Sequence, residues 1–292
     1  MKRWAVLALL GVTASWGSTF FLIKNILDAH VPVLDFLAVR FSVAALAVFL
    51  IFPRAVGRLP RATLRRAGVL GLLYGVAQIL QTTGLATTPA SVSGFITGMY
   101  VVATPIFAAV LLRHRIGATT WGAVLLALLG LGVLTLSGFS VGYGEALTFI
   151  AALIYALHIV GLGAWSTPEE ALGMSIVQLV MIALVCLVAT APNGIELPRD
   201  ASYWYSLLYM ALVAGAAALV LQTWAQAHLP PTSSAIIMSM EPVFAALFAV
   251  LFGGESFTVR MLVGGTMVLA AMLVVELVPH RRIDTEVPHL AV

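Results

Sequence analysis

A carboxylate directly precedes a proline in the apolar stretch IIMSMEPVFAALF, Ile236–Phe248. An acid at the centre of a membrane costs about 2.5 kcal/mol or more, so Glu241 is expected to face the interior of a helix bundle. Pro242 removes a backbone hydrogen bond and predicts a bend at the same depth. Two interpretations stay open. Glu241 either supports the bend through neighbouring backbone, or it binds substrate or protons.

Aromatic and polar side chains recur at helical spacing on other apolar segments of the chain. Glutamines and threonines there either hydrogen-bond helices to one another or line a wet cavity. The single histidine in this group is either a packed core residue or a group that changes charge near neutral pH. We take as candidate substrate-binding residues Trp16, Thr19, Tyr74, Gln78, Gln81, Tyr100, Tyr155, His158, Met238 and Glu241.

The elements that position these side chains are predicted to be transmembrane helices. Of the 292 residues, 61% are hydrophobic and only 9% are charged, which is far more apolar than a single soluble core needs. A helix spans a bilayer with about 20 apolar residues. The sequence predicts ten such helices: Trp4–Leu27, Phe36–Phe52, Ala67–Ala86, Val92–Leu112, Trp121–Ser137, Ala146–Gly163, Leu172–Ala191, Trp204–Gln226, Thr232–Phe252 and Val259–Val278.

The distribution of basic residues predicts the orientation, because cytoplasmic segments are enriched in Lys and Arg. With both termini in the cytoplasm, the inside segments carry Lys2, Arg3, Arg54, Arg58, Arg61, Arg65, Arg66, Arg113, Arg115, Arg281 and Arg282. The outside segments then carry only Lys24, Arg199 and Arg260. These charges are too few for nucleic-acid binding. The first hydrophobic stretch is also too long for a cleaved signal peptide.

The two halves of the chain resemble each other. TPIFAAVL (Thr104–Leu111) matches EPVFAALF (Glu241–Phe248), and LQTTGLA (Leu80–Ala86) matches LQTWAQA (Leu221–Ala227). Such matches at the same helix ordinals indicate duplication. Five helices per half is an odd number, so the copies must have opposite orientations, as in many secondary transporters. The predicted units are a first repeat at 1–137, a second repeat at 138–279 and a polar cytoplasmic tail at 280–292.

Two features have simpler explanations than a functional site. Arg40 is expected to extend to the outer interface or to pair with Asp35, because it lies near the predicted start of its helix. GFSVG (Gly138–Gly142) matches a hydrolase nucleophile pattern around Ser140, but that motif requires a preceding strand. The sequence contains no ATP-binding loop and no metal-binding spacing. No enzymatic activity, cofactor or metal is therefore predicted.

The stretches SWGSTFFLIK, FLAVRFSVAAL, ASVSGFITGMYVVATPIFA and TSSAIIMSMEPVFAALFAVLFGGE resemble the EamA-type repeats of the drug/metabolite transporter superfamily. The resemblance covers nearly the whole chain. It implies an all-α membrane protein of ten transmembrane helices, in two inverted five-helix repeats around a central cavity. One departure is that the acid closing the proline stretch is Glu255 in the second half but Ala118 in the first.

Within the superfamily the chain is most similar to the bacterial aromatic amino acid exporters called YddG. This resemblance implies a monomer in the bacterial inner membrane that exports small metabolites without ATP, with membrane lipid and an amino acid as its partners. Phe, Trp and Tyr are the expected substrates, with Met and Leu slower. Exporters of other metabolites or drugs, lipid flippases of the same superfamily and intramembrane enzymes are the alternatives.

Overall fold

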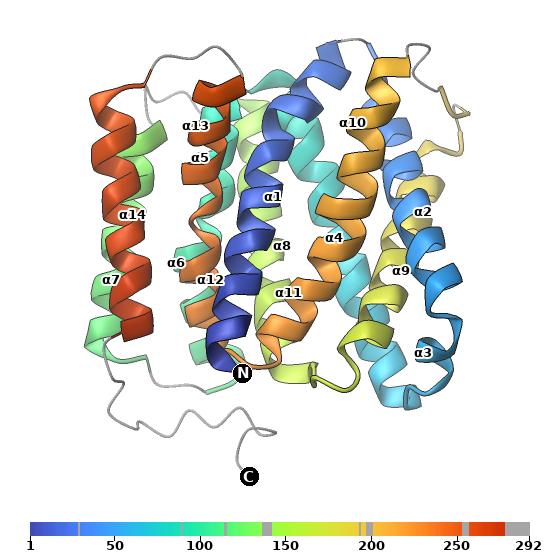
Figure 1. Ribbon diagram of the computed structural model, residues 1–292, viewed down its shortest axis with the longest axis horizontal. Helices are drawn as coiled ribbons and strands as arrows, with labels where there is room; N and C mark the ends of the chain where they lie inside the picture. Colours follow the sequence, from blue (N-terminus) through green and yellow to red (C-terminus); the bar gives the residue numbers. More distant parts are fainter. Residues whose placement is uncertain are drawn as a thin grey trace.

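The computed structural model describes residues 1–28, 30–88, 90–113, 116–135, 142–192, 194–196, 201–252 and 257–277, and this part is helical, with no strand (Figure 1). The elements are α1 (Lys2–Asp28), α2 (Val33–Ile51), α3 (Pro53–Gly57), α4 (Arg61–Thr87), α5 (Ala90–Gly98), α6 (Tyr100–Leu111), α7 (Ala118–Thr135), α8 (Tyr143–Trp165), α9 (Ala171–Thr190), α10 (Ala201–Ala211), η1 (Leu212–Ala217), α11 (Ala218–Gln226), α12 (Pro231–Met238), α13 (Glu241–Phe252) and α14 (Val259–Leu277).

Among the described residues, seven helical stretches are long and apolar enough to cross a membrane: Lys2–Ile23, Val33–Ile51, Arg61–Thr87, Tyr143–Trp165, Ala171–Thr190, Tyr203–Gln226 and Pro231–Phe252. Three shorter apolar stretches occupy Ile96–Leu111, Ala118–Val133 and Leu262–Val274. Large apolar side chains such as Leu50, Val188 and Val110 are exposed on the outer surface of the bundle. A surface of this kind suits lipid, and the protein is a multi-pass membrane protein.

Both proline-containing stretches are interrupted, and the sequence predicted a bend at Pro242. Helix α12 ends at Met238 and α13 begins at Glu241. Pro242 has no N–H to donate to the Met238 carbonyl, so the regular ladder cannot continue through this point. The corresponding break between α5 and α6 lies at Met99, although Pro105 itself sits inside α6. The breaks place non-helical backbone beside the centre of the bundle, where protein rather than lipid surrounds it.

An interruption that the sequence did not predict occurs between α10 and α11. The six-residue segment η1 has π-helical geometry, and it contains no proline. Its counterpart in the first half, α4, is a regular helix over 27 residues. Single π-helical turns inside helices occur frequently at functional sites.

The two halves pack against each other through helix pairs that cross the repeat boundary. Helix α4 packs against α8 and α9, α1 against α11 and α13, and α7 against α14. Glycines allow the closest approaches. A Cβ atom at Gly71 would lie 2.7 Å from the Gln178 carbonyl oxygen, and one at Gly84 would lie 2.4 Å from the Thr148 hydroxyl. Glycine at these two positions therefore marks close helix contacts.

Several predicted features lie outside the described residues. These are the loop containing Ser140, the acid at Glu255 and the tail from residue 280 onward. In the described part, the N-terminus, α3 and the segment joining α8 to α9 lie at the same end of the bundle (Figure 1).

Candidate functional site

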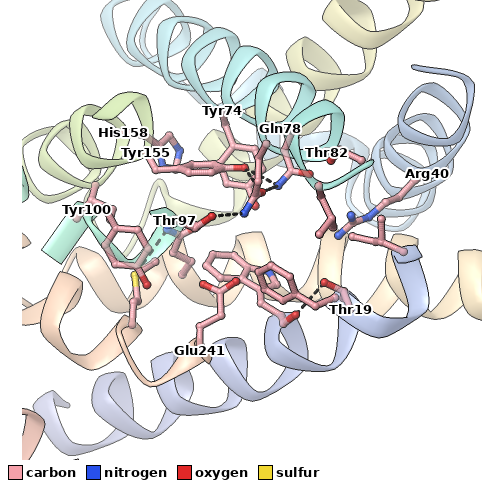
Figure 2. A pocket seen from close by; sticks show the side chains of 18 residues that line it. Thr19, Arg40, Tyr74, Gln78, Thr82, Thr97, Tyr100, Tyr155, His158 and Glu241 are labelled. Carbon is pink, nitrogen blue, oxygen red and sulfur yellow. Dashed lines mark hydrogen bonds between the residues drawn. The ribbon is translucent and has the colours of Figure 1, made fainter. Parts of the chain in front are cut away.

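A cavity of about 50 Å³ lies between the two halves, and all ten candidate residues named from the sequence line it (Figure 2). They come from α1, α4, α6, α8, α12 and α13, so both repeats contribute. Arg40, Thr82, Thr97 and Gln222 line the same space. The structure therefore gathers side chains that the sequence could place only on separate helix faces.

The cavity is small for an organic ligand. A volume of about 50 Å³ would hold roughly four water molecules. Pockets that bind small molecules usually measure about 300–1,000 Å³. A ligand of amino acid size would therefore require the helices around the cavity to separate from their positions in this structure.

A hydrogen-bond network along one wall joins α4, α5 and α8. Gln78 Nε2 donates to the Tyr155 hydroxyl at 2.7 Å, and that hydroxyl donates to Gln81 Oε1 at 2.9 Å. Gln81 Nε2 donates in turn to Thr97 Oγ1 at 3.0 Å. The amide of each glutamine thus bonds to a neighbouring helix, and both glutamines also line the cavity. These residues therefore fit both interpretations given from the sequence, bonding between helices and lining of a cavity.

His158 lies next to this wall with its ring buried. Its Nε2 is 2.8 Å from Gln178 Oε1, while Nδ1 has no hydrogen-bond partner among the described residues. The Tyr74 ring meets the His158 ring edge to face at a centroid distance of 5.1 Å and the Tyr155 ring at 5.4 Å. The carbonyl-type Oε1 accepts, so the Nε2–H tautomer fits this arrangement.

The first helix contributes Trp16 and Thr19 from the opposite side. Trp16 Nε1 donates to the Ala214 carbonyl at 2.9 Å, and Ala214 belongs to η1. Thr19 Oγ1 donates to the Trp16 carbonyl at 2.8 Å, one turn earlier on its own helix. The indole is thus fixed by the π-helical segment of the other half.

Glu241 enters the cavity from the break between α12 and α13 and is 7% exposed. Its carboxylate forms no hydrogen bond with any described residue, so the structure shows no bond from this acid to neighbouring backbone. Tyr100 also lines the cavity, and its hydroxyl is buried without a partner in the described part of the chain. Figure 2 shows Glu241 and Tyr100 directed into the same space.

Met238 is contacted by two amides from α11. Gln226 Nε2 lies 3.3 Å and Gln222 Nε2 lies 4.0 Å from its sulfur. Gln222 was not among the sequence candidates, although it aligns with Gln81 in the matching motifs LQTTGLA and LQTWAQA. Aligning the two halves and taking the residues that match the first-half candidates would have identified Gln222.

The expectation for Arg40 was wrong. Its side chain is 3% exposed and lines the central cavity rather than extending to the outer interface. Asp35 is not its partner, because Asp35 accepts hydrogen bonds from the Thr190 hydroxyl and the Glu196 backbone N–H. Arg40 Nε instead donates to the Met210 carbonyl at 3.1 Å. An ionisable residue buried in a membrane protein usually marks a substrate or ion pathway. The position of Arg40 inside a predicted transmembrane helix was therefore the sequence signal that it could line the cavity.

Comparison with known proteins agrees with this architecture. The profile of the EamA-like transporter family matches the chain twice, over residues 3–136 and 142–277. The chain belongs to the EamA-like transporter family. It is a transporter of the drug/metabolite superfamily rather than an enzyme, and its two EamA repeats cover nearly all of its length.

The individual relatives do not narrow the function beyond that of the family. The chain is 30% identical over 277 residues to an "Uncharacterized transporter" of Archaeoglobus fulgidus, covering 94% of this chain and 87% of that protein. Over 107 residues it is 26% identical to a "Probable terminal-alkyne amino-acid exporter" of Streptantibioticus cattleyicolor, covering 35% of this chain and 34% of that one.

A solved crystal structure superposes with a TM-score of 0.76 at 16% identity, covering 97% of this chain and 99% of the other. At that identity the likeness shows the fold alone. None of these relatives singles out the YddG exporters.

Proposed function

We propose that this EamA-family member is a secondary transporter that exports amino acids, with a preference for Phe, Trp and Tyr. The proposal rests chiefly on the cavity, where aromatic rings and a few polar groups from both halves surround one space. Rings and a thioether stack on flat side chains, at about 0.5–1.5 kcal/mol per aromatic pair beyond area burial.

The transport cycle we propose is alternating access. The three shorter apolar stretches would also cross the membrane, giving ten transmembrane helices in two inverted repeats with both termini in the cytoplasm of a bacterial inner membrane. Inverted repeats place the substrate near the midplane and open the site to each side by rocking. The small cavity is compatible with a conformation in which the halves are closed around the site.

The substrate class has one further line of support. The Streptantibioticus cattleyicolor relative carries the name of an amino-acid exporter, although it matches only 35% of this chain. A mainly apolar pocket with a few polar groups that fix orientation is also the usual design of a small-molecule site.

Reconstituted protein tests the proposal directly. Liposomes loaded with labelled Phe should release it faster with the protein than without it, and excess unlabelled Trp should compete. Leu and Met should compete less well. Movement of a cationic drug or a sugar with no movement of Phe or Trp would contradict the substrate assignment.

A further inference from the structure

Two opposite charges share the cavity without pairing with each other. Arg40 comes from α2 of the first half and Glu241 from α13 of the second, and both line the cavity. No ion pair joins them, nor does either form one with another residue in the described part of the chain. Figure 2 shows their charged ends directed into the pocket from different sides.

The packing around Arg40 leaves its binding groups free. Its Nε donates to the Met210 carbonyl, and the guanidinium carbon lies 5.0 Å from the Phe41 ring centroid and 5.9 Å from that of Phe36. The two terminal nitrogens make no hydrogen bond with any described residue. A guanidinium fixed on one side and stacked on aromatic rings presents its remaining N–H groups in a fork that matches a carboxylate.

Glu241 has the complementary arrangement. Its carboxylate has no hydrogen-bond donor among the described residues, and it borders the same empty space. Removing a charge from water without a partner is costly, so each of these groups gains if a ligand supplies the opposite charge. A ligand that brings only one charge would satisfy only one of them.

We infer that Arg40 binds the carboxylate and Glu241 the ammonium group of a zwitterionic α-amino acid. This inference rests on the proposed function and deepens it, because it makes both free ends of the amino acid a requirement for recognition. The aromatic residues of the cavity contact the side chain of the bound amino acid, whereas Arg40 and Glu241 recognise its carboxylate and ammonium groups. Because the charges belong to different halves, the zwitterion also bridges the two repeats once the helices have separated enough to admit it.

A panel of analogues tests the inference on the unmodified protein. Labelled Phe transport into liposomes is measured against 2-phenylethylamine, which lacks the carboxylate, and 3-phenylpropionate, which lacks the ammonium group. Each analogue should compete at least about tenfold less well than unlabelled Phe, the loss expected for a charge-assisted hydrogen bond. Competition by either analogue within about twofold of Phe overturns the inference.

Two substitutions test which side chain binds which end of the amino acid. Arg40→Gln should weaken Phe competition about tenfold or more while leaving competition by 2-phenylethylamine unchanged. Glu241→Gln should weaken competition by Phe and by 2-phenylethylamine and leave competition by 3-phenylpropionate unchanged. Arg260→Gln is the matched control, since Arg260 Nε donates to the Val133 carbonyl at 3.3 Å at an exposed position away from the cavity. A purely structural role for Arg40 would weaken all three compounds equally and would overturn the inference.

The outcomes separate this inference from the proposed function. Failure of the wild-type protein to transport Phe overturns the proposed function and this inference with it. Transport of Phe with equal competition by 2-phenylethylamine overturns the inference alone. Should a variant fail to fold, the wild-type panel still decides, because it requires no substitution.

Discussion

The Tyr155 hydroxyl accepts a hydrogen bond from Gln78 Nε2 at 2.7 Å and thereby ties α8 of the second half to α4 of the first. The same hydroxyl donates to Gln81, so one phenol satisfies two amides at the wall of the cavity. A rocking motion that separates the halves at this wall would have to break this junction. Its strength should therefore influence both the stability and the opening of the protein.

Tyr155→Phe should lower the free energy of unfolding by about 1–3 kcal/mol, because it removes both hydrogen bonds of the phenol and leaves Gln78 Nε2 and Gln81 Oε1 only their mutual 3.4 Å hydrogen bond. Thermal unfolding of the detergent-purified protein measures the change. Tyr205→Phe is the control, because Tyr205 is 78% exposed. Equal melting temperatures for the two variants would show that the junction contributes nothing.

Glu241→Gln should abolish the pH dependence of Phe transport. Protonation of Glu241 removes its attraction for an ammonium group, so Phe binding to the wild-type protein should weaken as the pH falls. Arg40 is the other charged side chain lining the cavity in the described residues, and arginine does not titrate in this range. Flux measured over a pH series in liposomes checks the expectation, and a variant profile that still parallels the wild type would refute it.

His158→Gln provides the comparison, and its pH profile should match that of the wild type. The His158 ring is held by Gln178 at Nε2 and has no carboxylate partner in the described part of the chain. A neutral ring suits this position, and glutamine preserves a polar group there. A flattened profile in this variant would assign proton coupling to His158 instead of Glu241.

Gly17→Ala should destabilise the contact between α1 and α13 by about 1–3 kcal/mol. A Cβ atom at Gly17 would lie 2.7 Å from Phe244 Cβ and 2.9 Å from the Glu241 carbonyl oxygen. Gly11→Ala on the same helix is the control, because nothing lies within 4 Å of its Cβ position. Reduced thermal stability of both variants alike would contradict a packing explanation.

Cysteine labelling should determine the orientation. In a Cys186→Ala background, Glu169→Cys should react with an impermeant thiol reagent only from the cytoplasmic side, and Glu196→Cys only from outside. Both positions are exposed, whereas Ser166 in the same loop as Glu169 is buried, with its hydroxyl bonded to the Leu162 carbonyl. Labelling of Glu169→Cys from outside would reverse the predicted topology.

The existence of the helices and the membership of the cavity could be predicted because both follow local patterns. Apolar stretches define helices in lipid, and polar residues such as Gln78 and Tyr155 are too costly to face it. Their partners could not be predicted. Periodicity places Gln78 and Tyr155 on the inner faces of their helices, but it does not tell which helices meet or at what height.

Arg40 shows a second limit of prediction from the sequence, the depth of a residue in the membrane. Its distance along the chain from the helix start suggested an interfacial position, and a sequence gives no measure of tilt or depth. The acceptor that holds it, the Met210 carbonyl, is a backbone atom and leaves no mark in the side-chain pattern. The π-helical geometry of η1 was equally invisible, because LVAGAA has the composition of an ordinary transmembrane helix.

Segment η1 also determines how α10 and α11 are rotated relative to each other about the helix axis. A π-turn holds one more residue than an α-turn, and each residue of an α-helix advances by about 100° around the axis. Deleting a single residue within Leu212–Ala217 would restore regular winding and leave α10 and α11 facing nearly the same way, because the wide turn already absorbs the extra residue. Deleting a residue from α11 instead would rotate α10 by about 100° relative to Gln222 and turn the Met210 carbonyl away from Arg40. The two halves can therefore align in sequence at Gln81 and Gln222, differ by one residue beyond η1, and still present the same helix faces to the cavity.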